Sequence, residues 1–432
     1  MTARGLLQAS SRQLLIDVLL VARGALIGQA PFVLATPLIT RLYPASQLGI
    51  YGLALAFVGI AAPVVGLRYE LAAISASDRD DARALFSLSA LAIVPLSAAS
   101  ALVLCALKTL GIGSYNALSW TIVAATCLTV AAAGTYSTLR CWLVRRHRFA
   151  LVSNSTTLQG ALRAFLAVVL APLGAGAMQL IAAELVSRLT GAGMMALRGG
   201  LRGTLGAVRI PASMLWQRAR KFWKYPLLMG PSALIDSAAA ALPVPILATY
   251  YGLEATGKFA LVQRVVMLPA TFIVSSVGDV FHAHAASISG QHADSVGSFL
   301  ATTALRLLLF ALAIYVPVAL VAPFTAKWIF GPQWADTGLM IAVLVPLCIA
   351  QTVVSPISRG LLLAGREERK LFADVACLVL PIATLYLMRK HSILTAIAAF
   401  SAASVVAFVI YYVVIVTALQ KGLPALRPAR EQ

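Results

Sequence analysis

Long runs of apolar residues recur from one end of this chain to the other, and they constrain its fold more than any other feature. Of the 432 residues, 60% are hydrophobic and 11% are charged. An apolar run of about 18 residues can cross the hydrocarbon core of a bilayer as a helix. The pattern predicts spans at 14–39, 48–74, 84–107, 117–140, 149–171, 176–197, 224–249, 259–281, 300–323, 337–358, 373–389 and 393–418. Little chain remains between them, so we expect an all-α polytopic membrane protein with about twelve transmembrane helices.

Basic residues are distributed unevenly between the predicted loops. With the N-terminus in the cytoplasm, and with the span-end residues Arg140, Lys224 and Arg389 counted in the adjoining loops, 22 of the 34 Lys and Arg residues fall in cytoplasmic segments, 6 on the opposite side and 6 within spans. This positive-inside pattern predicts a multi-pass membrane protein with both termini cytoplasmic. The first apolar run has no small-residue cleavage site after a short core, so we expect it to be retained. The net charge of +19 therefore reflects the orientation of the chain in the membrane, and nucleic acid is not an expected partner.

A basic segment separates six predicted spans from the next six. It predicts an N-terminal lobe at 1–197, a cytoplasmic linker at 198–223 and a C-terminal lobe at 224–432. Such paired halves are common in transporters. The linker mixes Arg and Lys with Trp216 and Trp223, so it either binds anionic phospholipid at the inner leaflet or is an ordinary positive-inside loop.

Ionisable residues inside the spans are informative because each costs about 2.5–3.5 kcal/mol at a helix centre. Arg23, Arg163 and Arg264 have no acid three or four residues away in sequence, so we expect them to line a polar cavity. Arg68 either lines that cavity or extends to the membrane surface. Guanidinium groups facing one cavity would form an anion site suited to phosphate. Glu70, at the end of its span, is expected to meet a basic loop residue.

Acids within the predicted spans suggest two further roles. Glu184 and Arg188 are four apart with the acid first, the favourable order for a helical pair, and are expected to form a structural ion pair. Asp236 lies near the middle of a span. It either couples transport to a proton or sodium ion or offsets one cavity arginine.

Other motifs do not indicate an enzyme, a metal or a cofactor. "GLEATGKF" has Phe259 where a nucleotide-binding loop needs a hydroxyl, so ATP binding is not expected. "DRDD" at 78–81 lies in a short loop before a span, where helix capping explains the acids better than sugar transfer. His282 and His284 are two apart and do not converge on a helix, and they and His292 receive no role. The five cysteines form no C-x-x-C pair and are expected to be free.

Four sequence blocks resemble the O-antigen and exopolysaccharide flippases of the Wzx type, in the multidrug/oligosaccharidyl-lipid/polysaccharide exporter superfamily. "TRLYPASQLGIY" (Thr40 to Tyr51) is followed by "RYELA" (Arg68 to Ala72). In the second half, "QRVVMLP" from Gln263 is followed by the passage from "FGPQW" to "SPIS". The resemblance extends over nearly the whole chain.

That resemblance implies two six-helix lobes around a central cationic cavity. It implies a flippase that moves polyprenyl-pyrophosphate-linked oligosaccharide repeat units across the bacterial inner membrane by alternating access, for O-antigen, lipopolysaccharide or exopolysaccharide biosynthesis. Polysaccharide polymerase and glycosyltransferases would be its functional partners. Two alternatives are a cation-coupled multidrug exporter, expected to carry more buried acids than arginines, and a membrane glycosyltransferase or polysaccharide ligase, expected to carry a large outer loop.

Overall fold

A computed structural model describes residues 27–28, 30–76, 78–200, 211–287, 293–358, 361 and 367–419, with the side chains of 268–299, 367 and 419 left out. The chain divides into two compact units, Met1–Ala260 and Leu261–Gln432. The boundary falls within helix α10 (Pro243–Ser287). The predicted lobes at 1–197 and 224–432 place it elsewhere and remain a prediction.

Helices are the only regular elements among the described residues. In that part of the chain, eight helices are long and apolar enough to cross a membrane, and two shorter apolar helices cover Ala30–Leu42 and Ala45–Ala61. The predicted all-α polytopic fold class is therefore confirmed.

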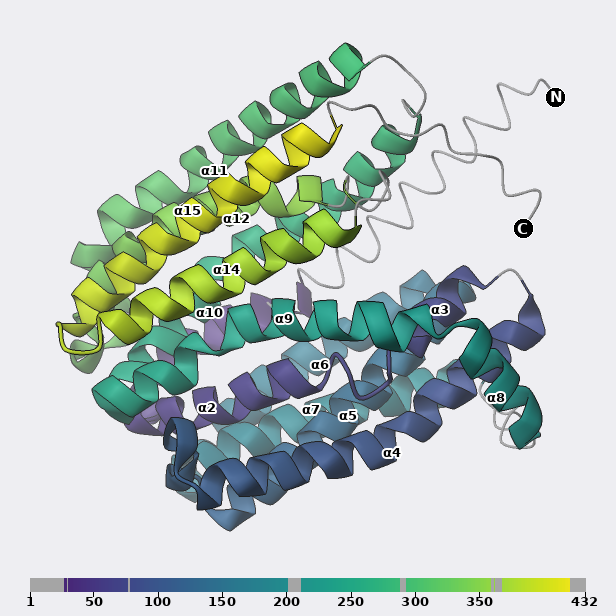
Figure 1. The fold of residues 1–432 in the computed structure, drawn as a ribbon. Coiled ribbons are helices and arrows are strands. Elements are labelled where there is room, and N and C mark those ends of the chain that lie inside the picture. Colours follow the sequence, from purple (N-terminus) through teal and green to yellow (C-terminus); the bar gives the residue numbers. More distant parts are fainter. Residues whose placement is uncertain are drawn as a thin grey trace. The chain divides into compact units, whose positions relative to one another are not determined.

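The first unit is a bundle of helices in which α5 contacts both α4 and α7, and α6 also packs on α7 (Figure 1). The helices α9 and α8 contact α2 and α4, respectively. Their bounds are α2 (Ala45–Ala61), α3 (Tyr69–Ser75), α4 (Arg79–Thr109), α5 (Trp120–Arg145), α6 (Phe149–Val169), α7 (Ala177–Arg198), α8 (Ala212–Lys221) and α9 (Gly230–Ala241).

The second predicted span, 48–74, is not one helix. The helix α2 ends at Ala61, two residues before Pro63, and α3 begins only at Tyr69. Proline has no N–H to continue the helical ladder and restricts the residue before it. Leu67 and Arg68 both adopt left-handed backbone conformations in the intervening turn. Apolarity predicted the extent of this segment, but not the break within it.

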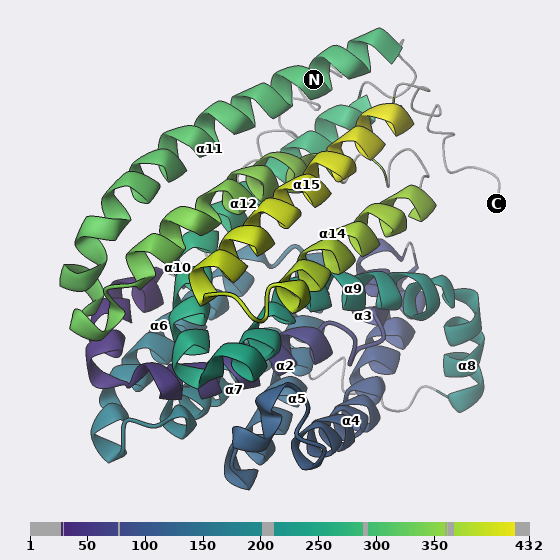
Figure 2. The same cartoon turned by 60° about the vertical axis from the view of Figure 1, so that its left-hand side comes forward.

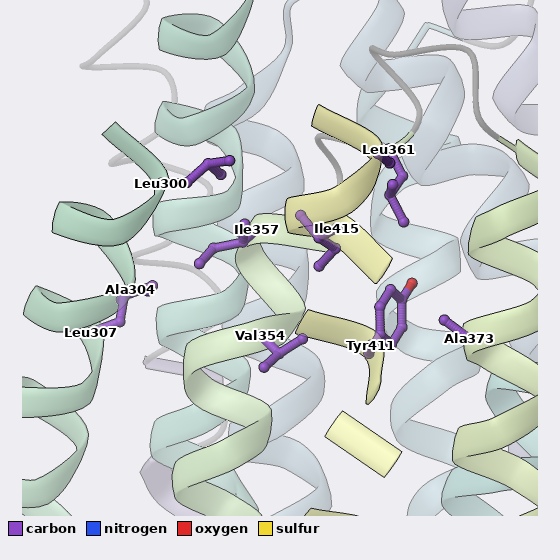
Figure 3. Close-up of a cluster of buried hydrophobic side chains, with 10 residues drawn as sticks. Leu300, Ala304, Leu307, Val354, Ile357, Leu361, Ala373, Tyr411 and Ile415 are labelled. Carbon is purple, nitrogen blue, oxygen red and sulfur yellow. The ribbon is translucent and has the colours of Figure 1, made fainter. Parts of the chain in front are cut away.

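The second unit contains the remainder of α10 with α11 (Ala293–Phe330), α12 (Thr337–Ser358), α14 (Glu367–Leu387) and α15 (Ile393–Leu419). In Figure 2, α12, α14 and α15 run beside one another, and α12 also packs on α11. Figure 3 shows the buried apolar cluster that joins them, where Tyr411 of α15 lies beside Ala373 of α14.

Two glycines, Gly160 and Gly257, let helices of the first unit cross at very short distance. A Cβ atom at Gly160 of α6 would lie 1.5 Å from the carbonyl oxygen of Gly28. A Cβ at Gly257 of α10 would lie 1.9 Å from the carbonyl oxygen of Ala45. Only glycine allows backbones to approach so closely, as is common between membrane helices.

Candidate functional site

A buried carboxylate, Glu184 of α7, organises the charged centre of the first unit. Its Oε1 lies 2.7 Å from Arg188 Nη2, one turn along the same helix. Its Oε2 lies 3.4 Å from Arg163 Nη1 of α6 and accepts a hydrogen bond from the Tyr51 hydroxyl of α2 at 3.3 Å. The predicted contact between Glu184 and Arg188 is therefore present, and we call these four residues the Glu184 cluster.

The side chains of this cluster differ in their exposure to solvent. The side chains of Glu184 and Arg163 are 1% and 9% exposed, whereas that of Arg188 is 24% exposed. The Arg163 guanidinium also lies over the Phe32 ring, 4.6 Å from its centroid. Two guanidinium groups thus share one carboxylate in a setting of low dielectric, where such interactions are strong and their loss is costly.

The acid that contacts Arg163 lies on a neighbouring helix, 21 residues away in sequence. The absence of an acid three or four residues from Arg163 holds for its own helix, but it does not extend to the neighbouring helix. The binding of substrate by Arg163 remains a prediction. The sequence signal that indicates this pair is Glu184, an acid at a comparable depth in the next predicted span.

Arg68 and Glu70 lie where the chain turns from α2 into α3. Arg68 is half-buried, and its Nε makes no hydrogen bond to any described residue. Glu70 is 4% exposed and accepts a hydrogen bond from Ser89 Oγ at 3.2 Å, while Ser89 bonds Thr138. Glu70 also interacts electrostatically with Arg68 in the turn, and the expectation that it meets a basic residue of a cytoplasmic loop remains a prediction.

The remaining predicted site residues are dispersed. Arg264 is half-buried on α10 in the second unit, and Asp236 is exposed on α9 in the first. Arg23 lies outside the described residues, as does His292. The roles predicted for Arg264 in anion binding and for Asp236 in ion coupling stay predictions.

Sequence reasoning missed a second buried carboxylate, Asp374 of α14. It is 3% exposed, forms an ion pair with Lys370 of the same helix, and accepts a hydrogen bond from the Tyr411 hydroxyl of α15 at 2.9 Å. We call these three residues the Asp374 cluster. Asp374 stands at the start of the predicted span 373–389, where hydropathy does not distinguish a buried acid from one at a solvated helix end.

The "DRDD" acids also have a role that the sequence did not indicate. Asp81 is 3% exposed and lies 2.8 Å from Arg218 Nη1 and 2.7 Å from Lys221 Nζ, both on α8. These contacts fix part of the basic linker to α4. Trp216 remains 72% exposed, so the aromatic side of α8 is available for the predicted contact with phospholipid.

A family model described as "Polysaccharide biosynthesis protein" matches residues 38–338, more than half of the chain. The chain belongs to the polysaccharide biosynthesis protein family. The family predicted from the four sequence blocks is therefore confirmed. Among curated protein sequences, none matches this family member significantly.

Solved structures of transporters share the fold of this family member. The inward closed lipid II flippase MurJ matches with a TM-score of 0.67 at 10% identity, over 92% of this chain and 87% of that one. An inward-facing multidrug resistance MATE family transporter of the MOP superfamily gives 0.65 at 16%, over 93% and 94%. A MOP superfamily transporter from Pyrococcus furiosus gives 0.64 at 15%, over 93% and 96%.

Proposed function

We propose that this protein is a flippase for lipid-linked oligosaccharides, which moves polyprenyl-pyrophosphate-linked repeat units across the bacterial inner membrane by alternating access. The observation that carries the proposal is a polysaccharide biosynthesis family model covering 38–338 on a transporter fold also found in a lipid II flippase. The described helices offer membrane spans without a large extramembrane domain, which favours transport over sugar transfer.

The charges within the helices support a substrate with a pyrophosphate. Arg163 and Arg188 come from two helices of one unit and converge on one carboxylate. Arg188 retains an exposed fraction, so it can reach a bound anion. Planar guanidinium groups match phosphate geometry with paired hydrogen bonds. In this proposal Arg23, Arg68, Arg163 and Arg264 contact the pyrophosphate or its sugars, while the lipid tail stays in the bilayer.

The membrane potential can supply energy for export. A head group with about two negative charges gains roughly 4–5 kcal/mol per 100 mV, inside negative, when it crosses the full field. Proton or sodium binding at Asp236 would add to this driving force but is not required for it. Glycosyltransferases would supply the repeat unit on the cytoplasmic side, and a polysaccharide polymerase would use it on the other, for O-antigen or exopolysaccharide.

A depletion strain tests the proposal. Loss of the protein is expected to lower surface polysaccharide and to increase lipid-linked repeat units on the cytoplasmic face, both measurable by gel and mass spectrometry. When the Arg264→Gln variant is expressed at normal level in the depleted strain, the loss of surface polysaccharide should persist. Lys390→Gln, which removes an exposed charge after α14, should restore export. Increased drug sensitivity with normal surface polysaccharide would instead favour the multidrug exporter.

A further inference from the structure

A basic pocket lies in the first unit where α5 ends and α4 begins, separate from the Glu184 cluster. It has a volume of about 600 Å³, within the ordinary range for a small-molecule site. Its basic lining residues are Arg79, Arg83, Arg145, Arg146 and His147. Neither Asp nor Glu is among the described lining residues.

Part of the pocket is a rigid frame. The Arg145 guanidinium donates hydrogen bonds to the carbonyl oxygens of Ala73, Ile74, Ala76 and Asp78, which end α3 and lead into α4. These four bonds fix the segment that carries Arg79 into the pocket. Arg145 therefore has a structural role. Its positive charge also raises the electrostatic potential in the pocket while its side chain stays in place.

The opposite side is a tight turn between α5 and α6. His147 has a left-handed backbone, and the Arg148 N–H donates to the Leu143 carbonyl at 2.9 Å. Arg146 lies over the Trp142 ring, 5.4 Å from its centroid, and donates to the Gly199 carbonyl at 3.2 Å. The turn thus presents a guanidinium already oriented by its neighbours.

The α4 side supplies two arginines that can reach a ligand. The Arg79 side chain is exposed and makes no hydrogen bond or ion pair with any described residue. Arg83 contacts Asp80 at 3.3 Å, but both side chains are more than half exposed. Such a surface pair contributes little, so Arg83 can exchange it for a stronger anion.

We propose that this pocket binds the phosphate group of an anionic membrane lipid. Several guanidinium groups around one cavity match phosphate oxygens, and Ile74, which lines the pocket and is 36% exposed, gives apolar contact for the glycerol or first methylenes. The positive-inside distribution predicts that this end of the unit is cytoplasmic, where anionic lipids concentrate. The site does not depend on the proposed transport function.

Calorimetric titration of the full-length protein in neutral detergent tests this site. One arm uses dihexanoyl phosphatidic acid, a second uses inorganic pyrophosphate and a third uses zwitterionic dihexanoyl phosphatidylcholine. Phosphatidic acid should bind, phosphatidylcholine should not, and the Arg79→Gln/Arg83→Gln double variant should weaken Kd by about tenfold or more. Arg148→Gln removes one positive charge from the same turn as Arg146 but outside the pocket lining, and should change Kd less than about twofold.

Three results would overturn the proposal. They are no binding of phosphatidic acid, binding of pyrophosphate alone, or equal weakening by the double variant and by Arg148→Gln, which would indicate diffuse attraction. Arg146→Gln provides a second test from the other wall and should also weaken binding. A photoreactive phosphatidic acid should crosslink to the peptides around 74–83 and 142–147, and crosslinking elsewhere would contradict the assignment.

Discussion

The Glu184 cluster and the Asp374 cluster each neutralise a buried carboxylate, but they do so with different numbers of cations. In each, one buried carboxylate meets a cation four residues away on its own helix and a tyrosine hydroxyl from a neighbouring helix. The Glu184 cluster adds Arg163 from a third helix. In the Asp374 cluster one ammonium pairs with the carboxylate, whereas in the Glu184 cluster two guanidinium groups pair with one carboxylate. The Glu184 cluster therefore depends more strongly on its acid and has more positive charge that can attract an anion.

Removing the shared acid should have the largest effect. Glu184→Gln leaves two guanidinium groups without their charged partner, which we expect to lower the free energy of unfolding by about 3–4 kcal/mol. Denaturant titration in detergent measures the change. Glu254→Gln is the matched control, because Glu254 is 67% exposed in its pair with Lys258 and should cost under about 1 kcal/mol. Equal effects of the two variants would mean that burial does not control this cluster.

The acid of the second unit should cost less to remove. Asp374→Asn removes the negative charge that pairs with Lys370 and keeps an oxygen for the Tyr411 hydroxyl, so we expect a loss of about 2–3 kcal/mol. The same titration measures it, with Asp80→Asn as the exposed control. A loss larger than that of Glu184→Gln would contradict the importance of the additional guanidinium.

Removing the additional guanidinium should make the first cluster resemble the second. Arg163→Met leaves the contact between Glu184 and Arg188, so we expect a loss of about 1–2 kcal/mol. In a Glu184→Gln background the same substitution should be neutral or stabilising, because it removes an uncompensated charge. A double-mutant cycle without this change of sign would show that Arg163 and Glu184 are not coupled.

The tyrosines should contribute least. Tyr411→Phe and Tyr51→Phe each remove one hydrogen bond to a carboxylate, for an expected loss of about 0.5–1.5 kcal/mol. The bond of Tyr411 is shorter, 2.9 Å against 3.3 Å, so its removal should have the larger effect. Thermal melting of the two variants side by side measures the order, and a larger effect at Tyr51 would reverse this ranking.

The sequence predicted the helical class and the family because both depend on local signals. Apolar run length indicates spans, and an acid four residues before Arg188 indicates a helical pair. Arg163 with Glu184 and Asp81 with α8 are cross-helix contacts, separated by 21 residues in one case and by more than 130 in the other. Such partners follow from how helices pack, which hydropathy does not determine. The turn at Arg68 was missed because one proline in an apolar run does not always end a helix.

Transport in vesicles tests the central claim most directly. Purified protein would be placed in liposomes containing a fluorescent polyprenyl-pyrophosphate oligosaccharide, with an external glycosidase to detect sugars in the outer leaflet. We predict cleavage beyond the initially exposed half in protein-containing vesicles, faster under an inside-negative potential. Cleavage equal to that of protein-free vesicles, in a preparation that transports a cationic drug, would contradict the assignment as a flippase for lipid-linked oligosaccharides.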